Sequence, residues 1–141
     1  MSKKYFLMLD DQRDPFDQNV IKFPDFCYDY ELVWVKNYQD FTFTLKERGL
    51  PEVVAFDFDL IALHYQAGQK TGFTSLVGYE LISEPTGLDC ARALIRYCES
   101  NKKQLPKFFV HSQNPAGNQA IRSLLEKYQS KQNKEQNAPK N

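Results

Sequence analysis

Three short apolar runs, each followed directly by polar residues, constrain the fold of this chain more than any other sequence feature. The runs are residues 5–9, 53–56 and 108–110, and the residues that follow them are Asp10 with Asp11, Asp57 with Asp59, and His111 with Ser112. Apolar runs of this length are typical of strands buried on both faces of a parallel sheet. Because ligands bind such sheets at the carboxyl ends of the strands, we expect acid, imidazole and hydroxyl groups along one binding edge.

Segments with helical spacing separate the predicted strands. We expect strands at residues 4–9, 31–35, 53–58 and 108–110, and helices at residues 38–48, at about 87–98, and from 115 or 118 to 128. This alternation predicts a doubly wound α/β domain with a mostly parallel sheet. The second strand most naturally flanks the first on the side away from the third, which gives the strand order 2-1-3-4. The winding then reverses beside Asp10 and Asp57, where a crevice is expected.

Three segments fall outside the strand and helix pattern. Residues 11–30 contain prolines and no sustained period, so we expect a long loop with at most a short helix, whose aromatic side chains either stack on a base or pack onto the domain. Residues 60–86 are longer than an ordinary connection and predict an inserted hairpin or lid after the third strand. Residues 129–141 are polar and predict a disordered tail, which leaves residues 1–128 as one domain.

Composition limits the class of protein and of ligand. A chain of 141 residues has room for one domain of ordinary size. Lysine plus arginine equals aspartate plus glutamate at 18 each, so no positive field favours an extended nucleic-acid groove. The three cysteines at positions 27, 90 and 98 form no CxxC pair, and neither a signal peptide nor a membrane-spanning stretch is evident. We therefore expect a cytoplasmic protein with no membrane partner.

The two aspartate pairs predict a divalent-cation site. Aspartate is also common in turns just after a strand, so either pair alone has an ordinary structural explanation. Two pairs on neighbouring strands would repel each other unless a cation lay among them. Magnesium prefers such oxygen ligands. We expect Asp10, Asp11 and Asp57 to hold Mg²⁺, with Asp59 orienting a ligand or a water molecule.

The segment after the fourth strand predicts an anion site. Ser112, Asn114 and the backbone amides around Gly117 lie between a strand and a helix, where helix N-termini bind phosphate. Helix capping by Ser112 or Asn114 is the structural alternative. His111 is either a hydrogen-bonded structural residue or a proton-transfer group beside the acids. Arg13 and Lys36 are both expected at this edge and could neutralise a phosphate oxygen, although each is also explained as an ordinary surface charge; Arg13 is slightly favoured.

Four blocks of this sequence resemble the signature blocks of the cyclic-phosphate-processing receiver domains. The blocks are residues 9–15, 56–60, 86–91 and 110–117, and the resemblance spans most of residues 4–128. It implies a doubly wound receiver-like, flavodoxin-type fold and a role in handling cyclic phosphate ends, as in RNA repair or nucleotide signalling. The family pattern has histidine between the two aspartates of the third strand, where this chain has Phe58.

These observations lead to one principal functional hypothesis and two alternatives. The principal one is a metal-dependent phosphoesterase that acts on a cyclic phosphate of a nucleotide or an RNA end, with Asp57, Asp59 and His111 as catalytic residues. The first alternative is a receiver-like signalling or protein-interaction module that accepts a phosphoryl group at Asp57 or docks a protein partner. The second is a protein that sequesters a cyclic nucleotide without cleaving it.

Overall fold

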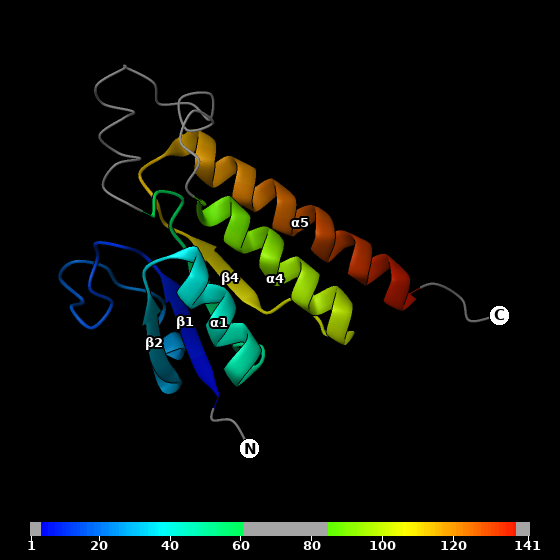
Figure 1. The fold of residues 1–141 in the computed structure, drawn as a ribbon, viewed down its shortest axis with the longest axis horizontal. Coiled ribbons are helices and arrows are strands. Elements are labelled where there is room, and N and C mark those ends of the chain that lie inside the picture. Colours follow the sequence, from blue (N-terminus) through cyan, green and yellow to red (C-terminus); the bar gives the residue numbers. More distant parts are fainter. Residues whose placement is uncertain (1–3, 61–84, 138–141) are drawn as a thin grey trace.

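A four-stranded, entirely parallel sheet forms the centre of the molecule. The computed structural model describes residues 4–60 and 85–137 (Figure 1). The strands are β1 (Tyr5–Leu9), β2 (Glu31–Val35), β3 (Val53–Phe56) and β4 (Lys107–Val110). Their order is β2-β1-β3-β4, and every pair is parallel. The predicted fold class and strand order are therefore confirmed.

The register of the sheet brings the ends of its strands to one level. Leu9 pairs with Val35 on one side and with Phe56 on the other, and Phe56 in turn pairs with Val110. Backbone hydrogen bonds continue one residue further, where the amides of Asp10, Asp57 and His111 donate to the carbonyls of the neighbouring strands at 3.0 Å. The first polar residue after each strand consequently belongs to the same edge.

The three α-helices of the described residues pack against one face of the sheet (Figure 1). They are α1 (Tyr38–Arg48), α4 (Gly87–Asn101) and α5 (Pro115–Asn137). Alternate strand residues such as Leu7, Val54 and Phe56 point to this face and share a buried core with Leu94 and Leu125 of the helices. The predicted helix 38–48 is confirmed, and its N-cap is Asn37, whose Oδ1 accepts the Asp40 amide at 2.7 Å.

The other face of the sheet is covered by the loop between β1 and β2. This loop contains one 3₁₀ helix, η1 (Asp25–Asp29), as its proline content and lack of period predict. Phe23 and Cys27 pack on Phe6 and Met8 of β1, and the Phe6 and Phe23 rings meet edge to face at 5.1 Å. Connections therefore lie on both faces of the sheet, and within residues 4–60 and 85–137 the α-helices lie on one face.

Helix α5 extends further than the sequence predicts. We expected disorder from residue 129, whereas the helix continues to Asn137. Gln132 explains the extension, because its buried side chain accepts the Leu105 amide at 3.1 Å and donates to the Lys103 carbonyl at 3.0 Å. A polar side chain thus anchors the last turns to the segment before β4. Residues 138–141 of the expected tail lie outside the described residues.

The inserted hairpin or lid expected over residues 60–86 lies outside the described residues, apart from its two ends. Among the helices of residues 4–60 and 85–137, none combines the length and the apolar character that a membrane span requires.

Replacing Gln132 by alanine tests the anchoring of α5. The change leaves the buried Leu105 amide and the Lys103 carbonyl without this partner, so we expect a loss of about 1–3 kcal/mol in the free energy of unfolding. Urea denaturation followed by circular dichroism measures it. Gln129→Ala is the matched control on the same helix, since Gln129 is exposed, and a change within about 0.5 kcal/mol is expected there. Equal effects of the two substitutions would show that the end of α5 is not held in this way.

Candidate functional site

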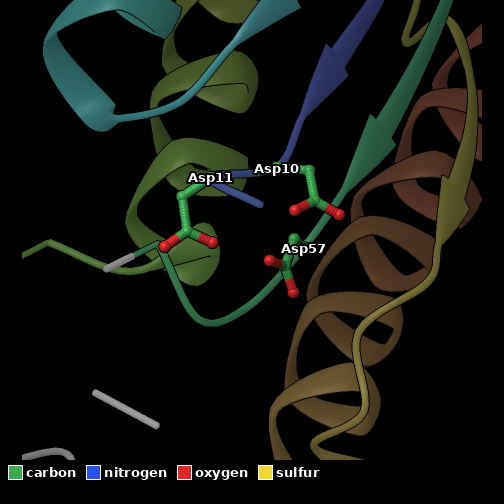
Figure 2. Close-up of side chains that lie close together, drawn as sticks. All are labelled: Asp10, Asp11 and Asp57. Atoms are coloured by element: carbon green, nitrogen blue, oxygen red, sulfur yellow. The ribbon is translucent and has the colours of Figure 1, made fainter. Parts of the chain in front are cut away.

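Three aspartates meet where β1 and β3 end (Figure 2). Asp10 and Asp11 follow β1, and Asp57 follows β3. Each contributes one carboxylate oxygen to a group whose members all lie within 4.8 Å of one another. The crevice expected at the reversal of winding therefore brings together the three residues predicted to bind the metal.

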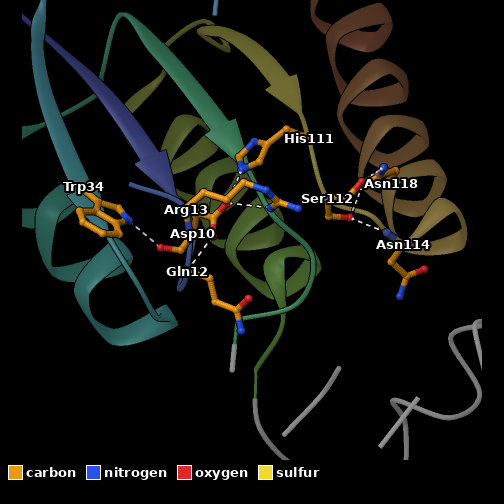
Figure 3. Close-up of polar contacts among 8 residues, drawn as sticks. All are labelled: Asp10, Gln12, Arg13, Trp34, His111, Ser112, Asn114 and Asn118. Carbon is orange, nitrogen blue, oxygen red and sulfur yellow. Dashed lines mark hydrogen bonds and ion pairs between the residues drawn. The ribbon is translucent and has the colours of Figure 1, made fainter. Parts of the chain in front are cut away.

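The carboxylate of Asp10 is fully buried and held by four hydrogen bonds. Its Oδ1 accepts the backbone amides of Gln12 and Arg13, each at 2.9 Å. Its Oδ2 accepts Arg13 Nη1 and His111 Nε2, each at 3.0 Å (Figure 3). Burial alone would raise the pKa of Asp10, but these hydrogen bonds lower it to about 2. Asp10 is thus ionised and oriented by the residues around it.

Asp57 and Asp11 have the opposite electrostatic balance. Burial raises the pKa of Asp57 to about 8, and the negative charges of Asp10, Asp59 and Asp11 add to this increase while Arg13 partly offsets it. Burial likewise raises the pKa of Asp11 to about 6, together with the charges of Asp10 and Asp59. These carboxyl groups are held close together in a region that disfavours their charge. A positive ion among them would relieve that repulsion.

The donor set fits a divalent cation of the magnesium type. All three groups are carboxylates, the hard oxygen ligands that Mg²⁺ prefers. Oxygens sharing one Mg²⁺ at about 2.1 Å lie about 3 to 4 Å apart, so small side-chain adjustments bring the observed group into range. The Asp10, Asp11 and Asp57 cluster is therefore consistent with the divalent-metal site of a receiver-like domain.

A pocket of about 310 Å³ opens onto this cluster. It is lined by Asp10, Asp11, Gln12, Arg13, Asp57, Asp59 and Gln113. Asp59 thus lies on the same pocket as Asp57, as the period of two predicts. Among the described lining residues, Arg13 is the positively charged one. Gln12 and Gln113 were not singled out from the sequence, although each directly follows a residue that was.

His111 contacts Asp10 but does not line the pocket. Because Asp10 is ionised, the hydrogen bond between them requires a proton on His111 Nε2. The other ring nitrogen, Nδ1, is buried and has no hydrogen-bond partner in the part of the chain that the structure describes. The imidazole also packs edge to face on Phe23, with ring centroids 5.6 Å apart. These contacts orient Asp10, and the proton-transfer role predicted for His111 stays a prediction.

Trp34 also supports Asp10, and unlike His111 it was not singled out from the sequence. Its indole Nε1 donates to the Asp10 carbonyl oxygen at 2.6 Å (Figure 3). The ammonium group of Lys36 lies over the indole ring, 4.4 Å from its centroid. Trp34 is the penultimate residue of β2 and does not follow the strand, so only the pairing of β2 with β1 reveals this contact.

The residues predicted to hold phosphate cap the N-terminus of α5. Asn114 Oδ1 accepts the Gly117 amide at 2.9 Å, and Ser112 Oγ accepts the Asn114 amide at 3.2 Å. Ser112 Oγ also bonds to Asn118, whose Nδ2 donates to the Ser112 carbonyl at 2.7 Å. The capping alternative is thus seen directly, and none of Ser112, Asn114 and Gly117 lines the pocket. Asn114 Nδ2 is buried without a partner among the described residues, so phosphate binding there remains a prediction.

Two glycines fix the loop that carries Asp57. A Cβ on Gly117 would lie 2.3 Å from Cγ of the Phe58 ring, and a Cβ on Gly87 would lie 1.9 Å from the Asp57 carbonyl oxygen. The starts of α4 and α5 can therefore approach the loop this closely only because these residues have no side chain. Phe58 is buried in the helical core, while Asp57 and Asp59 line the pocket.

Comparison with known proteins identifies the family. A search of curated proteins and a search of solved structures each returned no match. A sequence-family model described as "Cyclic-phosphate processing Receiver domain" matches residues 5–127. This match covers the sheet, the helices as far as the middle of α5, and every residue of the aspartate cluster. The chain therefore belongs to the family of cyclic-phosphate processing receiver domains, as the resemblance of its four sequence blocks implied.

Proposed function

We propose that this protein is a metal-dependent phosphoesterase that opens cyclic phosphates on nucleotides or RNA ends. The observation that carries the proposal is the convergence of Asp10, Asp11 and Asp57 on one pocket that Arg13 also lines. Carboxylates suit a cation, and a guanidinium group suits phosphate oxygens. Family membership supports a cyclic phosphate as the substrate class.

The proposal assigns the cation to the three clustered aspartates. Asp11 and Asp57, together with Asp10, would hold Mg²⁺. A bound ion of this kind polarises a phosphoryl group and lowers the pKa of a water molecule. The hydrogen bonds of His111 and Trp34 to Asp10 would keep its carboxylate and its main chain in position.

The remaining residues of the pocket would bind and orient the reactants. Arg13 would neutralise phosphate oxygens, and Asp59 would orient the attacking water. Ser112, Asn114 and the Gly117 amide are the further phosphate contacts in the proposal, and they would require the α5 cap to rearrange. The water oxygen bonds to phosphorus and one ribose P–O bond breaks. The proton that water loses balances the proton gained by the released hydroxyl, and the product is a phosphomonoester.

Stability as a function of pH tests the electrostatics of the cluster. The pKa of Asp57 is raised to about 8 in the folded protein and that of Asp11 to about 6, so protonation of both groups favours folding. Their contribution is complete at low pH and is lost as the pH rises through these values. In the presence of a chelator, the free energy of unfolding should therefore fall as the pH rises from about 4, the ordinary aspartate pKa, to about 8. Since Mg²⁺ binds the charged forms, the stabilisation by Mg²⁺ should grow over the same range.

Asp57→Asn separates this effect from other titrations. The neutral side chain should make the chelated protein more stable than the wild type at pH 8 and should remove most of the stabilisation by Mg²⁺. Asp29→Asn, on the exposed surface of η1, is the matched control and should follow the wild type. Thermal unfolding in each buffer gives the comparison. A magnesium effect that is independent of pH, or that persists in Asp57→Asn, would contradict the assignment.

Turnover of cyclic nucleotides tests the function itself. The wild type with Mg²⁺ should convert one or more 2′,3′-cyclic nucleotides to phosphomonoesters, detectable by ³¹P NMR. Asp57→Asn should reduce the rate by about 100-fold or more, the size seen when one electrostatic catalytic group is removed. Asp29→Asn should keep the wild-type rate. No turnover in the wild type, or undiminished turnover in Asp57→Asn, would reject the proposed function.

Two further measurements test the alternatives. An acid-labile adduct on Asp57 after exposure to a small phosphodonor, seen by mass spectrometry without turnover, would support a receiver-type signalling module. Tight binding of a cyclic nucleotide without turnover would support sequestration. The position of Asp57 at the end of β3, lining the pocket, is compatible with phosphoryl acceptance.

A further inference from the structure

The described lining of the pocket carries more negative than positive charge. Among residues 4–60 and 85–137, it contains four aspartates and a single positively charged residue, Arg13. The charge of Arg13 opposes the increase in pKa of both Asp57 and Asp11. The guanidinium group therefore already does part of what a bound cation would do for this cluster.

The hydrogen bonds of Asp10 show which contact a metal ion would replace. Both oxygens are engaged: Oδ1 by two backbone amides of its own turn, and Oδ2 by His111 and Arg13. The backbone amides are fixed by the turn, and the His111 ring is held by Phe23, with only 10% of its side chain exposed. The Arg13 side chain is 24% exposed and faces the pocket. Of the four donors, the Arg13 guanidinium is the one that can leave without unfolding its surroundings.

A released guanidinium group would find a suitable ligand in the same pocket. Arginine presents paired N–H donors that match two phosphate oxygens, and charge-assisted bonds of this kind are about twice as strong as neutral ones. While Arg13 is bonded to Asp10, that donor is occupied by a carboxylate (Figure 3). A cation at the aspartates would take over the neutralisation of Asp10 and leave Arg13 for phosphate.

We propose that Arg13 is an internal, displaceable cation, so that a divalent ion at the aspartate cluster releases its guanidinium group to bind a phosphate group. The inference rests on the proposed function, since it concerns the same pocket. It makes Arg13 a residue that couples the two ligands. By linkage, phosphate must strengthen metal binding by the same factor by which the metal strengthens phosphate binding.

Binding measurements on the wild type test the coupling without turnover. Mg²⁺ is titrated by calorimetry with and without inorganic phosphate, and phosphate is titrated with and without Mg²⁺. Trp34 is the single tryptophan and its indole donates to the Asp10 carbonyl, so its fluorescence provides an independent reading of the same site. We expect each ligand to strengthen the other by about fivefold or more, by equal factors.

Arg13→Gln changes the affinity for Mg²⁺ in opposite directions, depending on whether Arg13 competes with the ion or supports Asp10. If Arg13 competes with the ion, its removal strengthens Mg²⁺ binding in the absence of phosphate, by roughly twofold to fivefold for a partly exposed ion pair. The coupling to phosphate is then lost. Arg13→Lys keeps the charge and should retain part of the coupling, which also guards against a folding defect in the first variant.

Arg92→Gln is the matched control. Arg92 forms the same type of i,i+3 ion pair with Asp89 on the surface of α4, at 3.5 Å, and does not line the pocket. This variant should bind Mg²⁺ and phosphate as the wild type does. Any association of Mg²⁺ with phosphate in free solution is common to all variants and cancels in the comparison.

Two results would overturn the inference. One is weaker Mg²⁺ binding in Arg13→Gln than in the wild type, which would make Arg13 a support for Asp10. The other is coupling that is absent in the wild type or unchanged in Arg13→Gln. Either result with intact turnover of cyclic nucleotides would reject the coupling and leave the proposed function standing. Coupling without turnover would do the reverse.

Discussion

The in-register parallel pairing of β1 with β3 is the contact on which the site depends. Because Leu9 and Phe56 pair directly, the residues that follow them, Asp10 and Asp57, enter the crevice at the same level. Pairing of β3 with β4 adds His111 at that level, and pairing of β1 with β2 brings Trp34 against the Asp10 carbonyl. A shift of one residue in any pair would turn these side chains to the opposite face of the sheet.

The clustered carboxyl groups repel one another less because Asp10 and Asp57 have different surroundings and different pKa values. Asp10 has four hydrogen-bond donors and a pKa of about 2, whereas burial beside other acids raises the pKa of Asp57 to about 8. One aspartate therefore serves as a fixed negative charge, and the other exchanges its proton near neutral pH. The close approach of Gly87 to the Asp57 carbonyl leaves no space for a side chain beside the loop that carries Asp57. The backbone around the cluster thus helps to define its position.

Much of this architecture could be predicted because it depends on local patterns. Uninterrupted apolar runs followed by Asp10 and Asp57 indicate buried strands and a polar edge, and alternation with helices fixes the strand order. The sequence placed His111 at the same edge as Asp10, but the hydrogen bond from Trp34 could not be predicted, since Trp34 reaches the Asp10 carbonyl only through tertiary packing. The predicted end of α5 was wrong for a related reason. Gln132 is polar, so it adds nothing to an apolar helical pattern, yet it is buried. Sequence periodicity detects apolar burial and misses polar anchors.

The long connection between β1 and β2 contributes both to the pocket and to the core on one face of the sheet. It begins with Asp10, Asp11 and Arg13, and it then supplies Phe23 and Cys27, which shield Phe6 and Met8 where a receiver-like sheet would otherwise be open to water. Local unfolding of this connection would expose core side chains and separate Asp10 and Asp11 from Asp57 at the same time. The geometry of the pocket and the burial of that sheet face are consequently lost together, as one cooperative unit.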